Sequence, residues 1–130
     1  MIVVDASAAI EMLLGMPAAA RVRSRLLGGA ESLHAPHLID LEVAQVLRRL
    51  SASGIATAGR CQTALEDLAD LPLVRHSHIP LLAEVWDLRH NLTAYDAIYI
   101  VLAEALDAPL VTCDAKMAAA PGHGAQVEVL

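Results

Sequence analysis

Short apolar runs alternate along this chain with longer segments of helical spacing. Ile2–Val4 and Leu110–Cys113 are apolar and too short for helices, so they are predicted to be buried strands. Weaker strand candidates are Leu33–Ala35, Pro72–His76 and, at an edge, Gln126–Leu130. The intervening segments predict helices at Ala8–Leu14, Ala18–Leu27, Leu38–Ser51, Ala58–Asp70, Ile79–His90, Ala94–Leu106 and Ala115–Ala118.

This alternation indicates an α/β fold with a mainly parallel sheet. Crossovers in such sheets are right-handed, and binding sites lie at the carboxyl ends of the strands. No linker, low-complexity segment or repeat divides the sequence, so residues 1–130 are predicted to form a single domain.

The segment Ala94–Leu106 is apolar on almost every side, and only Asp96, Tyr99 and Glu104 interrupt it. A helix of this kind normally lies in the core, where a lone carboxylate needs a partner. Thr93 could supply a local one, as a helix cap paired with Asp96. Alternatively, Asp96 faces a cavity and holds a cation. The segment by itself favours neither explanation.

A carboxylate follows two of the predicted strands directly. Asp5 comes after Ile2–Val4, and Asp114 comes after Leu110–Cys113. Either acid could simply cap the helix that follows, and for Asp5 or Ser7 alone this is the favoured interpretation. In a parallel sheet, however, both acids would project at the same edge.

The Leu38–Ser51 segment carries two further candidate acids, Asp40 and Glu42. Each lies about 80° from the centre of the apolar stripe, on opposite sides, at 100° per residue. Helical geometry therefore cannot decide which of them reaches a cleft.

Composition narrows the function classes. The chain is 56% hydrophobic with no Phe, so the core must consist mainly of Ala, Leu, Val and Ile. No apolar run reaches the roughly 18 residues of a membrane span, and the amino-terminal residues do not resemble a signal peptide. Two cysteines, Cys61 and Cys113, fit a cytoplasmic protein with reduced thiols. The net charge of −6 argues against a basic nucleic-acid clamp but not against a metal-dependent enzyme.

Converging acids would need a counter-charge, because like charges a few ångströms apart repel by about 1 kcal/mol per pair even in water. Oxygen ligands without Cys or His favour Mg²⁺ or Mn²⁺ over zinc. His76 and His78 have no third ligand at zinc-like spacing and are expected to be surface residues.

Four segments together resemble a PIN domain: Val3–Ser7, the helical Glu42, Leu92–Tyr99 and Val111–Asp114. The compact length further resembles the VapC toxins of toxin–antitoxin pairs. The resemblance covers essentially the whole chain. It implies a three-layer fold with four to five central strands flanked by helices, and a toxin acting as a metal-dependent endoribonuclease.

The resemblance also implies roles for individual residues. Asp5 and Asp96 would be the main ligands of Mg²⁺ or Mn²⁺, and Glu42 and Asp114 would act directly or through water. The resemblance thus selects Glu42 over Asp40. Catalysis would be hydrolysis of RNA by metal-activated water, with Ser7 and Thr112 as supporting polar positions. The implied partners are an RNA substrate, a VapB-like antitoxin covering the acidic groove, and a second copy of the chain in a homodimer.

Two other classes remain open from the sequence. A receiver-like or haloacid-dehalogenase-like phosphotransfer domain also places Asp after strands. Against it, Ser7 stands where the dehalogenase type needs a second acid, and Lys116, the only lysine, follows the wrong acid for a receiver. The other class is a non-catalytic binding module whose acids are only helix caps. Asn substitutions separate it from an enzyme, because Asn still caps a helix.

Overall fold

The computed structural model describes residues 1–130 and contains one five-stranded sheet. Its strands are β1 (Ile2–Val4), β2 (Leu33–Pro36), β3 (Leu73–His76), β4 (Leu110–Thr112) and β5 (Val127–Val129). They lie in the order β3-β2-β1-β4-β5, and every neighbouring pair is parallel. The α/β class predicted from the alternating pattern is confirmed, and the sheet is parallel throughout.

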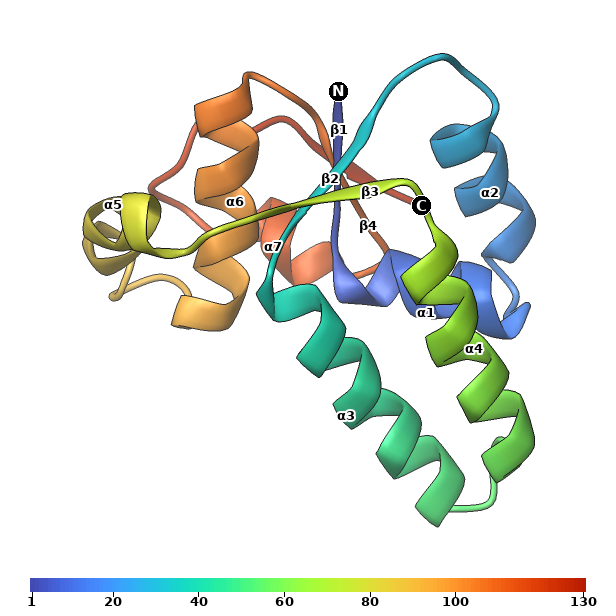
Figure 1. The fold of residues 1–130 in the computed structure, drawn as a ribbon. Helices are drawn as coiled ribbons and strands as arrows, with labels where there is room; N and C mark the ends of the chain where they lie inside the picture. Colours follow the sequence, from blue (N-terminus) through green and yellow to red (C-terminus); the bar gives the residue numbers. More distant parts are fainter.

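Helices cover both faces of the sheet (Figure 1). Right-handed crossovers put the helices between β1 and β3 on one face and those after β3 on the other. The first layer comprises α1 (Ala6–Leu14), α2 (Ala19–Leu27), α3 (Leu38–Ala52) and α4 (Ala58–Asp70), and the second comprises the 3₁₀ turn η1 (Ile79–Leu81), α5 (Leu82–Asp87), α6 (Ala94–Leu106) and α7 (Ala115–Ala119).

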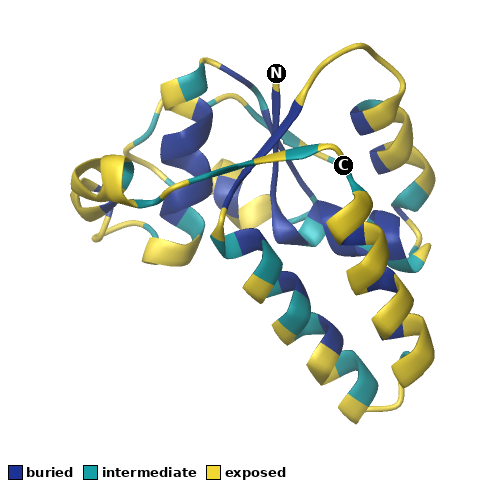
Figure 2. Ribbon diagram, in the orientation of Figure 1, coloured by how far each residue is buried: buried dark blue, intermediate teal, exposed yellow.

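The core is aliphatic, as the composition predicts, and is centred on β1 and α6. Strand β1 is buried along its whole length, and α6 is buried from Ala97 to Ala103 (Figure 2). Tyr99 is the one large aromatic side chain in this core. No helix of the structure combines the length and the apolar character that crossing a membrane requires.

The order of the strands creates a switch point beside β1. The chain moves outward through β2 and β3, then returns across the sheet to place β4 on the other side of β1. In open α/β sheets, ligands bind outside the carboxyl ends of the strands at such a point. In this protein those ends lie at the lower edge of the sheet in Figure 1, where α1, α3 and α6 begin.

The helix predicted at Ile79–His90 is wrong in extent. It begins as the 3₁₀ turn η1, and α5 ends at Asp87. The N–H groups of Leu88 and Arg89 then donate to carbonyls three residues back, which is the pattern of a turn. Trp86 and Arg89 form a cation–π contact with the guanidinium 4.8 Å from the ring centroid, and Trp86 is 65% exposed. Part of the helical spacing in this segment therefore reflects a surface contact.

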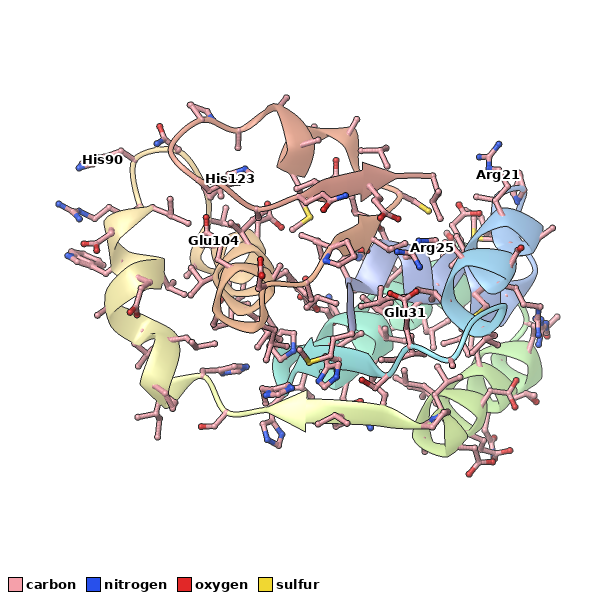
Figure 3. The ribbon with its side chains drawn as sticks, turned by 90° about the horizontal axis from the view of Figure 1, so that it is seen from above. Arg21, Arg25, Glu31, His90, Glu104 and His123 are labelled. Carbon is pink, nitrogen blue, oxygen red and sulfur yellow. The ribbon has the colours of Figure 1, made fainter.

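The edge strand β5 is tied to α2 by ion pairs. Arg25 donates to both carboxylate oxygens of Glu128 at 2.6 and 3.1 Å, and to Glu31 at 2.8 Å. Figure 3 shows Arg25 and Glu31 pointing toward one another, while Arg21 points away. The pair with Glu128 holds the last strand beside β4, which carries part of the site described below.

Candidate active site

A pocket of about 360 Å³ opens where β1 and β4 end. Five carboxylates line it. Four of them come from four different elements, Asp5, Glu42, Asp96 and Asp114, and the fifth, Glu11, lies on α1. Sequence reasoning predicted that these four acids converge, and the structure brings all of them to one pocket. Their chemical roles stay predictions.

Asp5 is the most enclosed of the four acids, with 5% of its surface exposed. Its carboxylate accepts from the backbone N–H of Ala8 at 2.9 Å, from the Thr112 hydroxyl at 2.6 Å and from the Ser7 hydroxyl at 2.8 and 2.9 Å. An ionised carboxylate has about four acceptor positions. Three donors therefore leave roughly one position of Asp5 for another ligand.

The two supporting hydroxyls are themselves held by the backbone that follows β4. The N–H of Cys113 donates to Ser7 Oγ, and the N–H of Asp114 donates to Thr112 Oγ1, both at 2.9 Å. Each hydroxyl accepts one bond from the backbone and can give its own proton to Asp5. The network fixes the Asp5 carboxylate between β1 and β4.

Burial raises the pKa of Asp5, and the bonds from Ala8, Thr112 and Ser7 offset only part of the shift. Asp5 also caps α1 through Ala8, so the capping role considered from sequence is present as well. Capping uses one acceptor position and leaves the carboxylate in the pocket.

The structure separates Glu42 from Asp40, which the helical wheel could not do. Asp40 receives two hydrogen bonds of 2.8 Å from the Arg75 guanidinium, so β3 neutralises it. Glu42 lines the pocket, and its buried Oε1 has no hydrogen-bond partner. Burial is the main cause that raises the pKa of Glu42, and the charges of Asp96 and Asp5 add to it.

Asp96 combines both explanations that the sequence left open. The Thr93 hydroxyl caps α6 by accepting from the backbone N–H of Asp96 at 3.2 Å. The Asp96 carboxylate nevertheless lines the pocket. Burial, and then the charge of Asp114, raise the pKa of Asp96. The cap therefore occupies the backbone of Asp96 and leaves its side chain available.

Asp114 lies at the start of α7, where it accepts from the backbone N–H of Lys116 at 3.0 Å. The ammonium of Lys116 offsets a small part of the rise in the pKa of Asp96 that burial and Asp114 cause, so its charge acts on this acid. Asp114 thus resembles Asp5 in capping a helix and lining the pocket.

The histidines outside the pocket differ from the expectation of simple surface residues. Nδ1 of buried His34 and Nε2 of His76 are 2.8 Å apart, and His78 Nε2 accepts from the N–H of Leu38. His76 and His78 are half-buried and hold β2, β3 and the start of α3 together. The register of β2 and β3 pairs His34 with Val74, two residues before His76. His34 therefore lies diagonally opposite His76 on the same face of the sheet.

Three lining residues with titratable side chains were not among the predicted site residues: Glu11, Tyr99 and Cys113. For Tyr99, the available signal was its position three residues after Asp96 in an otherwise apolar helix. Glu11 looked like an ordinary helix residue, and its Oε2 accepts from the backbone N–H of Ala18. Nothing in the local sequence marks Cys113 as part of a cleft.

The pocket suits a hard cation by its chemistry. It offers carboxylate oxygens, among them a buried Glu42 oxygen without a partner. The acids surround the space without closing on one point, since no three His, Cys, Asp or Glu side chains form a ready cluster. The residues that could hold the ion are Asp5, Glu42, Asp96 and Asp114.

Comparisons with known proteins agree on one family. The model of the PIN domain matches residues 2–122. Ribonuclease VapC1 of Mycobacterium tuberculosis is 44% identical over 129 residues, which cover 98% of this chain and 96% of the relative.

Solved structures share the fold. PAE2754 from Pyrobaculum aerophilum superposes with a TM-score of 0.72 at 22% identity, covering 99% of this chain and 83% of that one. VapBC2 from Rickettsia felis, solved bound to a DNA fragment from its promoter, gives 0.66 at 16% identity, with 99% and 98% covered. At such identities, the structures support the fold alone.

Proposed function

This chain belongs to the PIN domain family, and from that membership we propose that it is a VapC-type toxin, an endoribonuclease that hydrolyses RNA phosphodiester bonds. The observation that carries the proposal is the meeting of four carboxylates in one pocket at the switch point of the sheet. A relative named as a ribonuclease, 44% identical over nearly the full chain, supports the reaction class. The phosphotransfer domain and the non-catalytic module are not favoured.

We propose Mg²⁺ or Mn²⁺ as the cofactor. Such a cation polarises phosphate oxygens and lowers the pKa of a bound water. Asp5 and Asp96 are the proposed main ligands, with Glu42 and Asp114 acting directly or through water. The hydroxyls of Ser7 and Thr112 keep the Asp5 carboxylate oriented through the bonds described above.

Glu42 and Lys116 are the side chains that would orient the attacking water and attract the phosphate of the RNA. The Glu42 carboxylate lines the pocket, so it can orient the attacking water. The raised pKa of Glu42 makes its carboxylate a better proton acceptor than an ordinary glutamate. Lys116 adds a positive charge beside Asp96 and can draw the phosphate of the RNA toward an otherwise acidic pocket.

The proposed partners follow from the relatives. The VapBC2 structure supports a VapB-like antitoxin, whose Arg or Lys would pair with the acidic pocket by strong charge-assisted bonds. We further propose a homodimer, to be tested by light scattering, and a cytoplasmic site of action, where cellular RNA is found. The whole of residues 1–130 is proposed to act as a single domain.

The decisive experiment is cleavage of total bacterial RNA, including transfer RNA, by the purified protein with Mn²⁺ and with EDTA. Asp96→Asn runs alongside, because Thr93 caps the backbone of residue 96 and the variant should fold normally. Discrete fragments that need Mn²⁺ and are absent from the variant support the proposal. Equal cleavage by parent and variant contradicts the assignment of Asp96.

A further inference from the structure

Two polar atoms in the pocket are buried without a hydrogen-bond partner: Glu42 Oε1 and the Tyr99 hydroxyl. Tyr99 is only 2% exposed, and both residues line the pocket of the four acids. Buried polar groups are almost always hydrogen-bonded, so an orphan calls for an explanation. Because both atoms without a partner belong to the same pocket, one explanation should account for both.

Tyr99 lies three residues after Asp96 on α6. Residues at this spacing project from the same side of a helix, which accounts for both side chains facing the pocket. The Tyr99 ring is buried in the core among neighbouring aliphatic side chains. Its hydroxyl is therefore presented to the pocket from a fixed position.

The carboxylates around the Tyr99 hydroxyl restrict it to the role of a hydrogen-bond donor. Burial, and then the charge of Glu42, raise the pKa of the Tyr99 hydroxyl, and the charges of Asp5 and Asp40 add to the shift. Ionised carboxylates only accept hydrogen bonds, so among them the hydroxyl can only donate.

Only one of the three carboxylates has a buried acceptor left without a donor. Asp5 already receives bonds from Ala8, Ser7 and Thr112. Both oxygens of Asp40 are taken by the guanidinium of Arg75. Glu42 Oε1 is the remaining acceptor.

We propose that Tyr99 is a positioning residue whose hydroxyl donates to the Glu42 carboxylate and holds it in the pocket for the cation. This inference rests on the proposed function. A glutamate carboxylate turns about three side-chain bonds, and fixing it beforehand reduces the entropy lost when a ligand binds. Partners that orient metal ligands in this way typically contribute about 10–100-fold to metal affinity or activity.

The test measures Mn²⁺ binding by isothermal titration calorimetry in the absence of RNA. Tyr99→Phe keeps the ring and removes only the hydroxyl, and we expect the Kd for Mn²⁺ to rise by about tenfold. At saturating Mn²⁺, the KM for RNA should be unchanged. Tyr95→Phe is the matched control, because Tyr95 is on the same helix and 64% exposed. It should bind Mn²⁺ as the parent does.

A double-mutant cycle with Glu42→Ala shows whether the effect passes through Glu42. In that background, Tyr99→Phe should cause no further loss of Mn²⁺ affinity. The metal-free melting temperature of Tyr99→Phe should fall only slightly, since one hydrogen bond is lost and the ring stays in the core. A merely structural role of Tyr99 would lower this temperature and leave the Kd for Mn²⁺ unchanged.

The outcomes are distinct. Equal Mn²⁺ affinity of parent and Tyr99→Phe overturns the role of Tyr99 and leaves the nuclease standing. A raised KM for RNA with unchanged Mn²⁺ affinity also overturns it, because Tyr99 would then contact the substrate. A persisting loss in the Glu42→Ala background shows that Glu42 is not the residue positioned. A parent that binds no Mn²⁺ refutes the proposed metal site, and the role of Tyr99 with it.

Discussion

The hydroxyl of Thr112 donates a 2.6 Å hydrogen bond to Asp5 Oδ2 and so joins the ends of β1 and β4 inside the candidate active site. Thr112 is fully buried, and its oxygen also accepts from the N–H of Asp114. One side chain thereby fixes the carboxylate of the first acid and the backbone of the fourth.

Replacing Thr112 by Val removes this hydroxyl at nearly constant shape. Asp5 loses a donor and the N–H of Asp114 loses its acceptor, so we expect the free energy of unfolding to fall by about 1–3 kcal/mol. The pKa of Asp5 should rise further, because the Thr112 bond lowers it in the parent. Urea denaturation measures the first effect. Thr112→Ser keeps the hydroxyl and should recover most of the stability; an equally unstable Ser variant would show that packing, not the bond, matters.

The second prediction contrasts two acids on α3. Glu42→Gln should reduce cleavage of RNA by more than about tenfold, because it removes a proposed ligand and water-orienting group. Asp40→Asn should leave cleavage within about twofold and lower stability by only about 0.2–1 kcal/mol, as is typical of a partly exposed ion pair. Rates under identical Mn²⁺ decide between them. Comparable losses in both variants would contradict the placement of Asp40 outside the reaction.

The third prediction concerns addition and removal of metal. Binding to the folded chain alone stabilises it by about 2.7 kcal/mol at one hundred times the Kd, so Mn²⁺ should raise the melting temperature by several degrees and EDTA should reverse this. In Asp96→Asn the rise should be smaller, while the metal-free melting temperature should not fall, since the repulsion with Asp114 is relieved. Differential scanning fluorimetry is sufficient. An undiminished rise in the variant would exclude Asp96 as a ligand.

The fourth prediction concerns pH and lies outside the pocket. Burial, and then the charge of His76, lower the pKa of His34 below its usual value of 6.5. The unfolded chain therefore takes up this proton more readily than the folded chain, and the stability linked to His34 is present above pH 6.5 and lost as the pH falls below it.

Melting temperatures at pH 8, 7, 6 and 5.5 in EDTA would measure this loss. His34→Gln cannot titrate, so its melting temperature should fall less steeply over the same range. The difference between parent and variant isolates His34 from the other titrating groups. Parallel curves would show that His34 does not contribute to the pH dependence.

The positions of the strands, and the placement of Asp5 and Asp114 at the same edge of the sheet, could be predicted from the sequence. Short apolar runs allow little besides buried strands, and parallel strands carry their following residues to one edge. The choice between Asp40 and Glu42 could not come from helical geometry, because the decisive contact is with Arg75 on another strand. The interaction of Tyr99 with Glu42 likewise joins α6 to α3, and no local pattern contains it. The length of α5 was predicted wrongly because Trp86 and Arg89, which are at helical spacing, contact each other on the surface and do not belong to a buried stripe.

The contact between Asp5 and Thr112 joins residues 107 positions apart in the sequence. Strand β1 emerges from the ribosome more than 100 residues before its neighbour β4, a separation that the 107 positions between Asp5 and Thr112 reflect. Contacts of such long range form only when nearly the whole chain is available to close the loop. A nascent chain can therefore contain α1–α4 and still lack a complete acidic pocket. The acidic pocket is therefore complete only after Asp114 has emerged and β4 has paired with β1.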